Sequence, residues 1–419
     1  MGGWQGFLVD KGLGSSHSCS IYHGNDSYTT VLNNSAVIVA AARTPIGRAF
    51  KGSLIEARPD DMAAFVINEL LSRVPQLDPA KVDDVIIGAA VGAGEQGYNL
   101  GRAVGLLAGL PVTVPGTTVN RMCASSLQAI RMAHHAIVAG EGDVFVAGGV
   151  ESVSRTRSVS FRTEDANPRF VDRDREDFVS RYYMPMGLTA ENVADKYGVT
   201  RADMDAFAKV SQDRAVAAQD AGVFGREIVP YPLGSGEVVS ADDGPRRNTT
   251  IDALSRLEPV FRADGRVTAG NSCPLNDGAA AVIVMSEKRA RELEIRPMAR
   301  ILGSAVSAVA PEMMGVGPIE AVRRVLATAG ISIADISVVE LNEAFAAQVL
   351  PVCRELGIDI ERQLNPHGGA IALGHPYGMT GARIMTALLN DLQTLDGELG
   401  IETMCVGGGQ GMAMLMQRI

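Results

Sequence analysis

Two cysteines and a histidine in this chain have side chains and surroundings suited to acyl transfer. Cys123 stands in the segment Asn120-Arg-Met-Cys-Ala-Ser-Ser-Leu127, after which apolar residues recur at helical spacing, so the cysteine lies at or near a helix start. A helix N-terminus stabilises negative charge, which would lower the pKa of the thiol and make it nucleophilic. Taken alone, a cysteine in this setting is more often a buried apolar residue.

His375 lies in the segment Gly374-His-Pro-Tyr-Gly378. The proline stiffens the backbone and the glycines leave space around the imidazole, which suits a base that takes a proton from a thiol. By itself, a histidine in such a loop can equally be structural.

A second cysteine, Cys405, ends an apolar segment and is followed by Gly407-Gly408-Gly409. Backbone N–H groups of a glycine run at a strand end can stabilise an oxyanion or bind phosphate. The segment lacks the lysine of a P-loop, so phosphate binding is the weaker interpretation. Asn342 could donate a hydrogen bond to an oxyanion, directly or through water, whereas its neighbour Glu343 could merely cap a helix.

Short apolar segments separated by helical patterns must position these side chains. We predict strands at residues 37–41, 85–87, 144–147, 338–339 and 404–406, and helices at 60–71, 201–221 and 319–327. This alternation predicts βαβ units and a largely parallel sheet. The order also repeats, because Cys123 follows Ile86 by as many residues as His375 follows Val338. Two related halves would bring Cys123 and His375 into one site.

The repeat suggests a division of the chain. Residues 1–35 differ in composition from the rest, and we predict a disordered or atypical extension without chemistry there. A first half would span 36–285, with an inserted loop domain at about 151–275, and a second half 286–419. The insertion holds seven arginines between residues 155 and 181 and the pair Arg246-Arg247. They would form a solvated, ion-paired surface or a cap that holds an anionic ligand.

Composition excludes several classes of protein. The net charge of −10 argues against a nucleic-acid partner. No apolar run reaches the roughly 18 residues of a membrane span. Five cysteines without CxxC spacing indicate neither a disulfide framework nor a zinc site. We therefore expect no metal, no membrane span and a cytoplasmic location.

Together these segments closely resemble the thiolase family. The matching stretches are Val39–Gly47, Asn120–Gln128, Gly187–Val193, Thr268–Asn271 with Asn276–Ala280, Asn342–Phe345, Gly368–Pro376 and Cys405–Gly411. They cover the chain from about 36 to 419 in the family's order, and the ordered set is far more specific than any single stretch. The resemblance implies an α/β thiolase fold, in which two pseudo-symmetric βαβαβαββ halves form a layered αβαβα core with an inserted loop domain.

The resemblance also implies roles for the reactive residues. Cys123 would attack the 3-keto carbon of a 3-ketoacyl-CoA and keep the shortened acyl group as a thioester, while His375 accepts its proton. Cys405 would protonate the departing acetyl-CoA carbanion and then deprotonate the incoming CoA. Asn342, through a water, and His375 would form one oxyanion hole, and the backbone N–H groups of Cys123 and Gly407 the other.

Coenzyme A enters through the resemblance as a co-substrate, with no permanently bound cofactor. Its binding residues would be Arg246, Phe261, Ala269, Cys273 and Phe345, and the protein would be a homodimer or homotetramer. Cys273 stands where many members have a serine facing the pantetheine. A thiol is a weaker hydrogen-bond partner than a hydroxyl.

The expected reaction is thiolytic cleavage of a 3-ketoacyl-CoA to acetyl-CoA and a shortened acyl-CoA, in fatty-acid or related lipid degradation. Pro185 stands where acetoacetyl-specific biosynthetic enzymes carry histidine, which disfavours the alternative of an acetoacetyl-CoA thiolase working in the condensing direction. A ketoacyl synthase of the same fold is disfavoured by Asn342 and Cys405. A non-catalytic thiolase-like lipid-binding or partner protein is disfavoured because all three reactive residues are present.

Overall fold

Apolar strands of both predicted halves pair into one sheet. The computed structural model describes residues 34–170 and 181–419. Its sheet strands are β1 (Ala36–Arg43), β2 (Gly47–Arg48), β3 (Asp84–Gly88), β4 (Gly116–Val119), β5 (Val144–Ser152), β8 (Asn276–Ser286), β9 (Ala299–Ala308), β10 (Val338–Leu341), β11 (Leu399–Val406) and β12 (Gln410–Arg418). They follow the order β10-β11-β12-β9-β1-β8-β5-β3-β4, with β2 beside β8. A separate small sheet pairs β6 (Tyr231–Pro232) with β7 (Val238–Val239).

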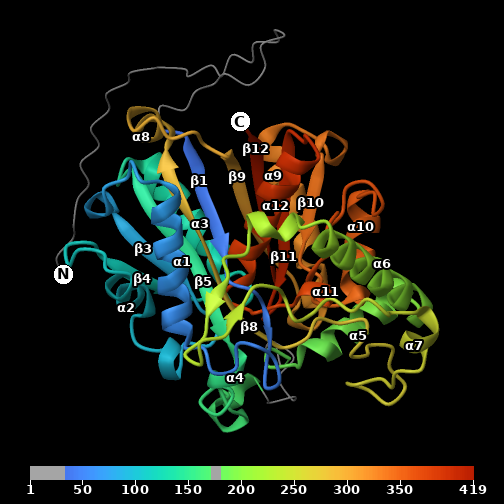
Figure 1. Cartoon of the computed structure of the whole chain (residues 1–419). Coiled ribbons are helices and arrows are strands. Elements are labelled where there is room, and N and C mark those ends of the chain that lie inside the picture. The colour runs from blue at the N-terminus through green and yellow to red at the C-terminus, as the bar shows by residue number, and fades with distance from the viewer. Residues whose placement is uncertain (1–33, 171–180) are drawn as a thin grey trace, which may run out of the picture. The chain divides into compact units, whose positions relative to one another are not determined.

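Both halves of the sheet have the same internal order, which confirms the repeat. β5 pairs parallel with β3 and antiparallel with β8, as β11 does with β10 and β12. β8 and β12 then pair antiparallel with β1 and β9. The expectation of a largely parallel sheet is therefore wrong, because within the described sheet only β3 with β4 and β5, and β10 with β11, pair parallel. The halves meet where β1 pairs with β9, over only Val37↔Arg300 and Ile38↔Ala299. Figure 1 shows the two sets of strands side by side.

Helices of the two halves cover and separate the sheets. They are α1 (Pro59–Arg73), α2 (Leu100–Leu107), α3 (Ser125–Ala139), α8 (Glu287–Glu292), α9 (Gly317–Ala329), α10 (Ala346–Leu356), α11 (Ala370–Leu373) and α12 (Thr380–Thr394). α3 and α12 contact each other. α3 packs on strands of the first half and α12 on strands of both halves, whereas α1 and α2 pack on the first half-sheet and α9 on the second. The layers are therefore αβαβα, as expected, with α3 and α12 in the middle layer.

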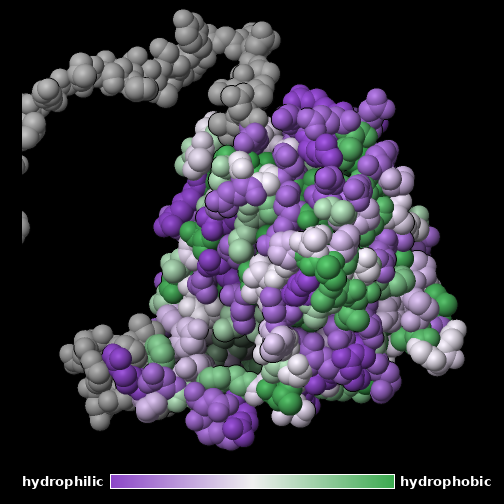
Figure 2. All heavy atoms as spheres, turned by 90° about the vertical axis from the view of Figure 1, so that its left-hand side faces the viewer, coloured by the Kyte–Doolittle hydropathy of each residue, from purple (hydrophilic) through white to green (hydrophobic). Residues whose placement is uncertain are grey.

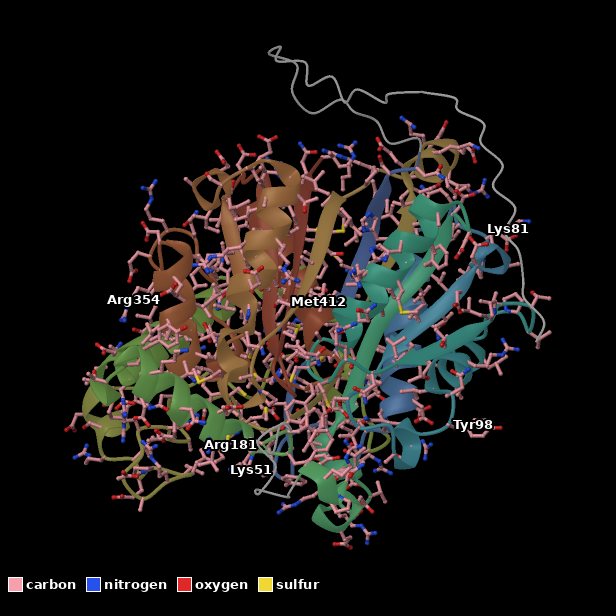
Figure 3. The ribbon with its side chains drawn as sticks, turned by 180° about the vertical axis from the view of Figure 1, so that it is seen from behind. Lys51, Lys81, Tyr98, Arg181, Arg354 and Met412 are labelled. Atoms are coloured by element: carbon pink, nitrogen blue, oxygen red, sulfur yellow. The ribbon has the colours of Figure 1, made fainter. Side chains whose placement is uncertain are left out.

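Three apolar clusters hold these layers together. One surrounds α3 and α12, a second packs α1 and α2 on the first half-sheet, and a third packs α9 and α10 on the second. Met412 of β12 is fully buried, whereas Tyr98 projects from the surface (Figure 3). The face beside α2 and β4 mixes hydrophilic and hydrophobic surface (Figure 2). No helix in the described residues is long and apolar enough to cross a membrane.

The inserted segment adds α4 (Val153–Thr156), α5 (Met186–Tyr197), α6 (Arg201–Asp220) and α7 (Ile251–Ser255). α5 and α6 pack against α10 of the second half, and Figure 1 shows α5, α6 and α7 gathered together at the lower right. The expectation of an ion-paired surface holds for Arg155, which pairs with Glu95, and for Arg162, which pairs with Glu164. Arg173, Arg175 and nearly all of the predicted extension lie outside the described residues.

Candidate active site

A tight turn between β4 and α3 carries Cys123. Met122, directly before it, has a left-handed backbone with a φ of 47°, which costs a non-glycine residue free energy and often marks a functional turn. Asn120 Oδ1 accepts a hydrogen bond from the Met122 N–H at 2.8 Å, and the Ser125 hydroxyl donates to the Met122 carbonyl at 2.6 Å. Since α3 begins at Ser125, Cys123 lies just before the helix, as predicted.

Burial raises the pKa of the Cys123 thiol to about 11. Hydrogen bonds from the backbone N–H groups of Gly407 and of Cys123 itself lower the pKa, and the nearby Glu151 raises it further. The expectation of a lowered pKa is therefore wrong, because donors near a helix start do not offset the loss of hydration. The residue keeps a partly exposed surface although protein atoms surround its sulfur. The resting nucleophile is a neutral thiol that needs a base.

The hydrogen bonds of His375 decide which ring nitrogen is protonated. His375 Nδ1 lies 2.7 Å from the Thr380 hydroxyl, and that hydroxyl donates its single hydrogen to the Pro376 carbonyl at 2.7 Å. Nδ1 must therefore carry a hydrogen and donate it to Thr380. This leaves Nε2 unprotonated, so the ring can accept a proton there.

Burial also keeps the imidazole neutral. His375 is 2% exposed, and its pKa is lowered to about 3, chiefly by burial and secondly by the charge of Arg383. Its backbone N–H donates to Asn276 Oδ1 at 2.9 Å. Gly374 has a φ of 117°, and a Cβ there would lie 2.7 Å from the Asn276 amide. Only glycine lets the loop approach Asn276 so closely.

Asn342 follows β10 and faces the same imidazole. Its Nδ2 lies 3.4 Å from His375 Nε2, which fits an amide N–H directed at an unprotonated ring nitrogen. Its side-chain oxygen is buried and has no hydrogen-bond partner among the described residues. Buried polar atoms in proteins are nearly always satisfied. This oxygen therefore marks a place for a water molecule or a polar group of a substrate.

Cys405 and the glycine turn after it approach the nucleophile from β11. Cys405 is buried and lies opposite Gly411 of β12. Gly408 and Gly409 have φ values of 80° and 81°, which turn the chain tightly into β12. A Cβ on Gly408 would lie 2.9 Å from the ring of Tyr182. This turn holds the Gly407 N–H against the sulfur of Cys123.

Three sulfur atoms lie within electrostatic reach of one another. Burial raises the pKa of Cys405, and the charges of Cys123 and Cys273 raise it further. Tyr377 lies near both the thiols and the histidine. Its ring contacts that of His375 edge-on at a centroid distance of 5.2 Å. Burial raises the pKa of Tyr377, and the charges of Cys273 and Cys123 raise it further. The structure therefore brings the predicted cysteines and histidine together in one place.

Residues expected to bind coenzyme A fall into two groups. Phe261 and Phe345 meet edge-on at 6.3 Å, and Cys273 lies beside them, since its N–H donates to the Ala344 carbonyl at 3.0 Å. Ala269 and Arg246 lie exposed on the inserted segment, and among the described residues no hydrogen bond or ring contact joins them to that group. The Arg246 side chain forms no ion pair with the described acidic residues. Its pKa is lowered by partial burial and by the charge of Arg48.

Thr380 and Asn276 orient the ring and the backbone of His375, a role that no sequence pattern predicted. Both stand inside or next to the motif stretches, but their partners became visible only in three dimensions. Glu343 accepts from the Ser211 hydroxyl, the Asn365 amide and the Ile371 N–H. Glu343 thus connects three segments of the chain next to Asn342. This structural role is larger than the helix cap that the sequence suggested. No group of residues in the described ranges has the geometry of a metal site.

Comparison with known proteins defines the class. The family model "Thiolase, N-terminal domain" matches residues 36–288, and "Thiolase, C-terminal domain" matches residues 295–418. The chain belongs to the thiolase family. It is therefore an acyltransferase of a family that acts on acyl-CoA and coenzyme A.

Individual relatives are similar over nearly their whole length. A 3-ketoacyl-CoA thiolase of Bacillus subtilis is 46% identical over 390 residues, which cover 90% of this chain and 98% of the relative. A beta-ketoadipyl-CoA thiolase of Acinetobacter baylyi is 45% identical over 399 residues, covering 92% and 99%. The crystal structure of the Bacillus anthracis acetyl-CoA acetyltransferase matches with a TM-score of 0.83 and 38% identity, covering 92% of this chain and 99% of that one.

Proposed function

We propose that this protein cleaves 3-ketoacyl-CoA thioesters with coenzyme A, through an acyl-enzyme on Cys123. The observation that carries the proposal is that one site holds a neutral, buried imidazole, unprotonated at Nε2, and a thiol that receives the Gly407 N–H. Tyr377 contacts the ring of His375 and lies within electrostatic reach of Cys123. The imidazole can deprotonate the thiol only while the Cys123 sulfur attacks the substrate, because the negative charge then passes to a substrate oxygen.

In the first half-reaction, the Cys123 sulfur bonds to the 3-keto carbon and its proton passes to His375 Nε2. The oxygen of the resulting tetrahedral adduct accepts hydrogen bonds from the N–H groups of Cys123 and Gly407, which already lie beside the sulfur. The bond between the 2- and 3-carbons then breaks. Asn342, through a water, and the newly formed Nε2–H of His375 stabilise the negative charge on the thioester oxygen of the departing fragment.

Cys405 completes both half-reactions as acid and base. Its thiol protonates the carbanion carbon, which releases acetyl-CoA, and the thiolate then takes the proton of the incoming CoA thiol. The CoA sulfur attacks the acyl-Cys123 thioester, the bond between the acyl carbon and the Cys123 sulfur breaks, and the shortened acyl-CoA leaves. The Cys123 thiolate takes its proton back from His375 Nε2, which restores the starting state. Burial raises the pKa of the Cys405 thiol, so it donates its proton only to a strong base such as a carbanion.

We assign coenzyme A to the surface formed by Phe261, Phe345, Cys273, Ala269 and Arg246. The paired aromatic rings offer an apolar wall for the pantetheine chain. The exposed Arg246, which has no ion-pair partner among the described residues, suits a phosphate group. We further infer a cytoplasmic protein that assembles as a homodimer or homotetramer.

Two acyl groups compete as the natural substrate. The absence of histidine at Pro185 and the Bacillus subtilis relative favour a fatty 3-ketoacyl chain in lipid degradation. The second candidate is a 3-ketoacyl-CoA that ends in a carboxylate, because relatives named beta-ketoadipyl-CoA thiolase are 45–46% identical to this chain.

The test is a cleavage assay of the pure protein with acetoacetyl-CoA, a medium-chain 3-ketoacyl-CoA and 3-ketoadipyl-CoA, each with free CoA. We expect cleavage with wild type, none with Cys123→Ala, and an acylated Cys123 peptide by mass spectrometry when CoA is withheld. The ratio of kcat/KM values identifies the acyl class. Cleavage that persists in Cys123→Ala, or no cleavage of any of the three substrates, would contradict the proposal.

A further inference from the structure

The central sheet has a gap beside β1. In sequence, β1 lies far from the glycine turn that follows Cys405. β1 pairs with β9 only at residues 37–38, and its next neighbour on that side is the segment around Ile228, which bridges to Arg43. Between these two points, residues 39–41 have no strand beside them on that side within the described residues. The sheet is therefore open where the two halves of the fold meet.

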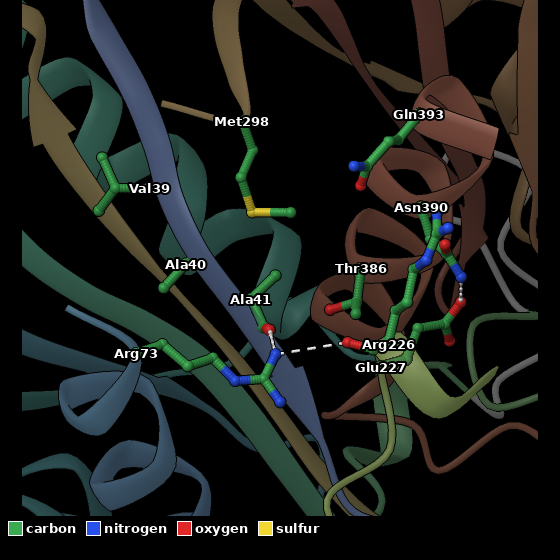
Figure 4. Close-up of a pocket in the computed structure, with 10 residues that line it drawn as sticks. All are labelled: Val39, Ala40, Ala41, Arg73, Arg226, Glu227, Met298, Thr386, Asn390 and Gln393. Carbon is green, nitrogen blue, oxygen red and sulfur yellow. Dashed lines mark hydrogen bonds between the residues drawn. The ribbon is translucent and has the colours of Figure 1, made fainter. Parts of the chain in front are cut away.

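A cavity of about 210 Å³ occupies this gap (Figure 4). Val39, Ala40, Ala41 and Met298 supply its apolar lining, and Thr386, Asn390 and Gln393 of α12 lie on its other side. The volume equals that of about seven water molecules in the liquid. It is smaller than the usual pocket for a drug-sized ligand, so a small metabolite fits it better.

Two arginines line the cavity, and one of them has no ion-pair partner in the part of the chain that the structure describes. Arg73 donates from Nη1 to the Ala41 carbonyl at 2.7 Å, and its Nε pairs with Glu69 at 2.9 Å. Arg226 donates to the Thr394 hydroxyl at 3.2 Å and forms no ion pair with an acidic residue of the described ranges.

The one acidic side chain in the lining is engaged by other residues. Glu227 pairs at 2.9 Å with the buried Arg43, which also pairs with Asp242 at 2.8 Å, and Glu227 accepts from the Asn390 amide at 2.7 Å. No carboxylate of the described residues pairs with Arg226 directly, so its guanidinium can pair with a ligand. A cation without a partner beside an apolar floor complements an anion that carries a short apolar tail.

We propose that this cavity is a second ligand site, which binds a short-chain carboxylate. The carboxylate would lie against Arg226 and the Gln393 amide, and the alkyl part against Ala40, Ala41 and Met298. The site is formed independently of the acyl-transfer residues. Its ligand would nevertheless touch α12, whose first residue, Thr380, holds the imidazole of His375.

Calorimetric titration of the full-length Cys123→Ala protein, saturated with CoA, tests the proposal, because CoA then fills its own site and the nucleophile is absent. The probes are butyrate, its neutral analogue butyramide, and inorganic phosphate. We expect saturable binding of butyrate, no binding of butyramide, and weaker binding of phosphate, which cannot use the apolar floor. Tighter binding of phosphate than of butyrate would overturn the choice of a carboxylate, and absence of saturable butyrate binding would overturn the site.

Variants locate the binding. Arg226→Gln should raise the Kd for butyrate about tenfold, the loss typical of one charge-assisted hydrogen bond. Gln393→Ala should raise it about threefold, and Arg362→Gln, at an exposed arginine outside the cavity, should leave it unchanged. Equal affinity in all three variants would show that butyrate binds elsewhere. Circular dichroism confirms that each variant is folded, and Gln393→Ala tests the site even if Arg226→Gln does not fold.

Discussion

At the scale of single residues, Thr380 decides the acid–base state of His375. The Thr380 hydroxyl has one hydrogen, which it donates to the Pro376 carbonyl, so it can only accept from His375 Nδ1. The opposite tautomer would place the hydrogen on Nε2, where it would block proton transfer from Cys123. A hydroxyl outside the reacting groups therefore controls the form of the base.

Thr380→Val keeps the shape of the side chain and removes the hydroxyl, so the preference between tautomers is lost. We expect kcat to fall about tenfold to a hundredfold, the loss of a buried hydrogen bond to a reacting group, while the KM for CoA stays nearly unchanged. Thr380→Ser restores the hydroxyl and should recover most of the rate. Steady-state kinetics measure this, and equal losses in the two variants would contradict a role through the hydroxyl.

At the scale of elements, the turn between β11 and β12 places the Gly407 donor. Gly408 and Gly409 both have positive φ values, and Tyr182 of the inserted segment lies over Gly408. Two strands and a segment far away in sequence thus hold one N–H at the sulfur of Cys123. A small change of the turn would move the donor away from the site where charge develops.

Gly408→Ala should therefore reduce both stability and activity. Positive φ with a Cβ costs about 1–3 kcal/mol, and the new methyl group would also press on Tyr182. Gly236→Ala is a matched control, because Gly236 has a φ of 90° with no atom within 4 Å of a Cβ. We expect both variants to lower the urea midpoint, but only Gly408→Ala to lower kcat, by more than about tenfold. Loss of kcat in neither variant would argue against the turn as an oxyanion donor.

At the scale of the whole molecule, ionisable side chains are buried between α12 and the second half-sheet, where no solvent reaches them. Arg383 of α12 lies 3.8 Å from Glu340 of β10, and Glu402 lies opposite Glu340 on β11. Neither carboxyl oxygen of Glu402 has a hydrogen-bond partner among the described residues. Burial raises the pKa of Glu402 well above its usual value, Arg383 lowers it, and Glu340 raises it further.

The raised pKa links folding to pH. Above the unfolded pKa of about 4.3, the folded state holds a proton on Glu402 that the unfolded state has lost, so stability falls as pH rises toward the folded pKa. The loss is roughly 1.4 kcal/mol per pH unit for this group. Glu402→Gln mimics the protonated form and should flatten the dependence of the urea midpoint between pH 5 and pH 7. The surface variant Glu361→Gln is the control, and parallel curves for wild type and Glu402→Gln would refute the assignment.

Local patterns along the chain were enough to predict several of the strands and helices and the reactive residues of the site. Strand and helix periods predicted β1, β3, β5 and α9, and equal spacing from Ile86 to Cys123 and from Val338 to His375 predicted that the two residues share a site. Both inferences rest on local patterns in the sequence, namely hydrophobic periodicity and glycine turns. The ordered motifs then identified the family.

How those residues behave depends on contacts that form only in the folded protein. The local helix start predicted a lowered pKa for Cys123, but packing by distant segments raised it, because burial sums contacts from the whole fold. The tautomer of His375 depends on Thr380 and Pro376. The position of its backbone depends on Asn276, which comes from the other half of the chain. The gap beside β1 likewise arises where the two half-sheets diverge. Hydrophobic periodicity predicts which face of a helix or strand is buried. It does not predict which atoms of other segments contact that face.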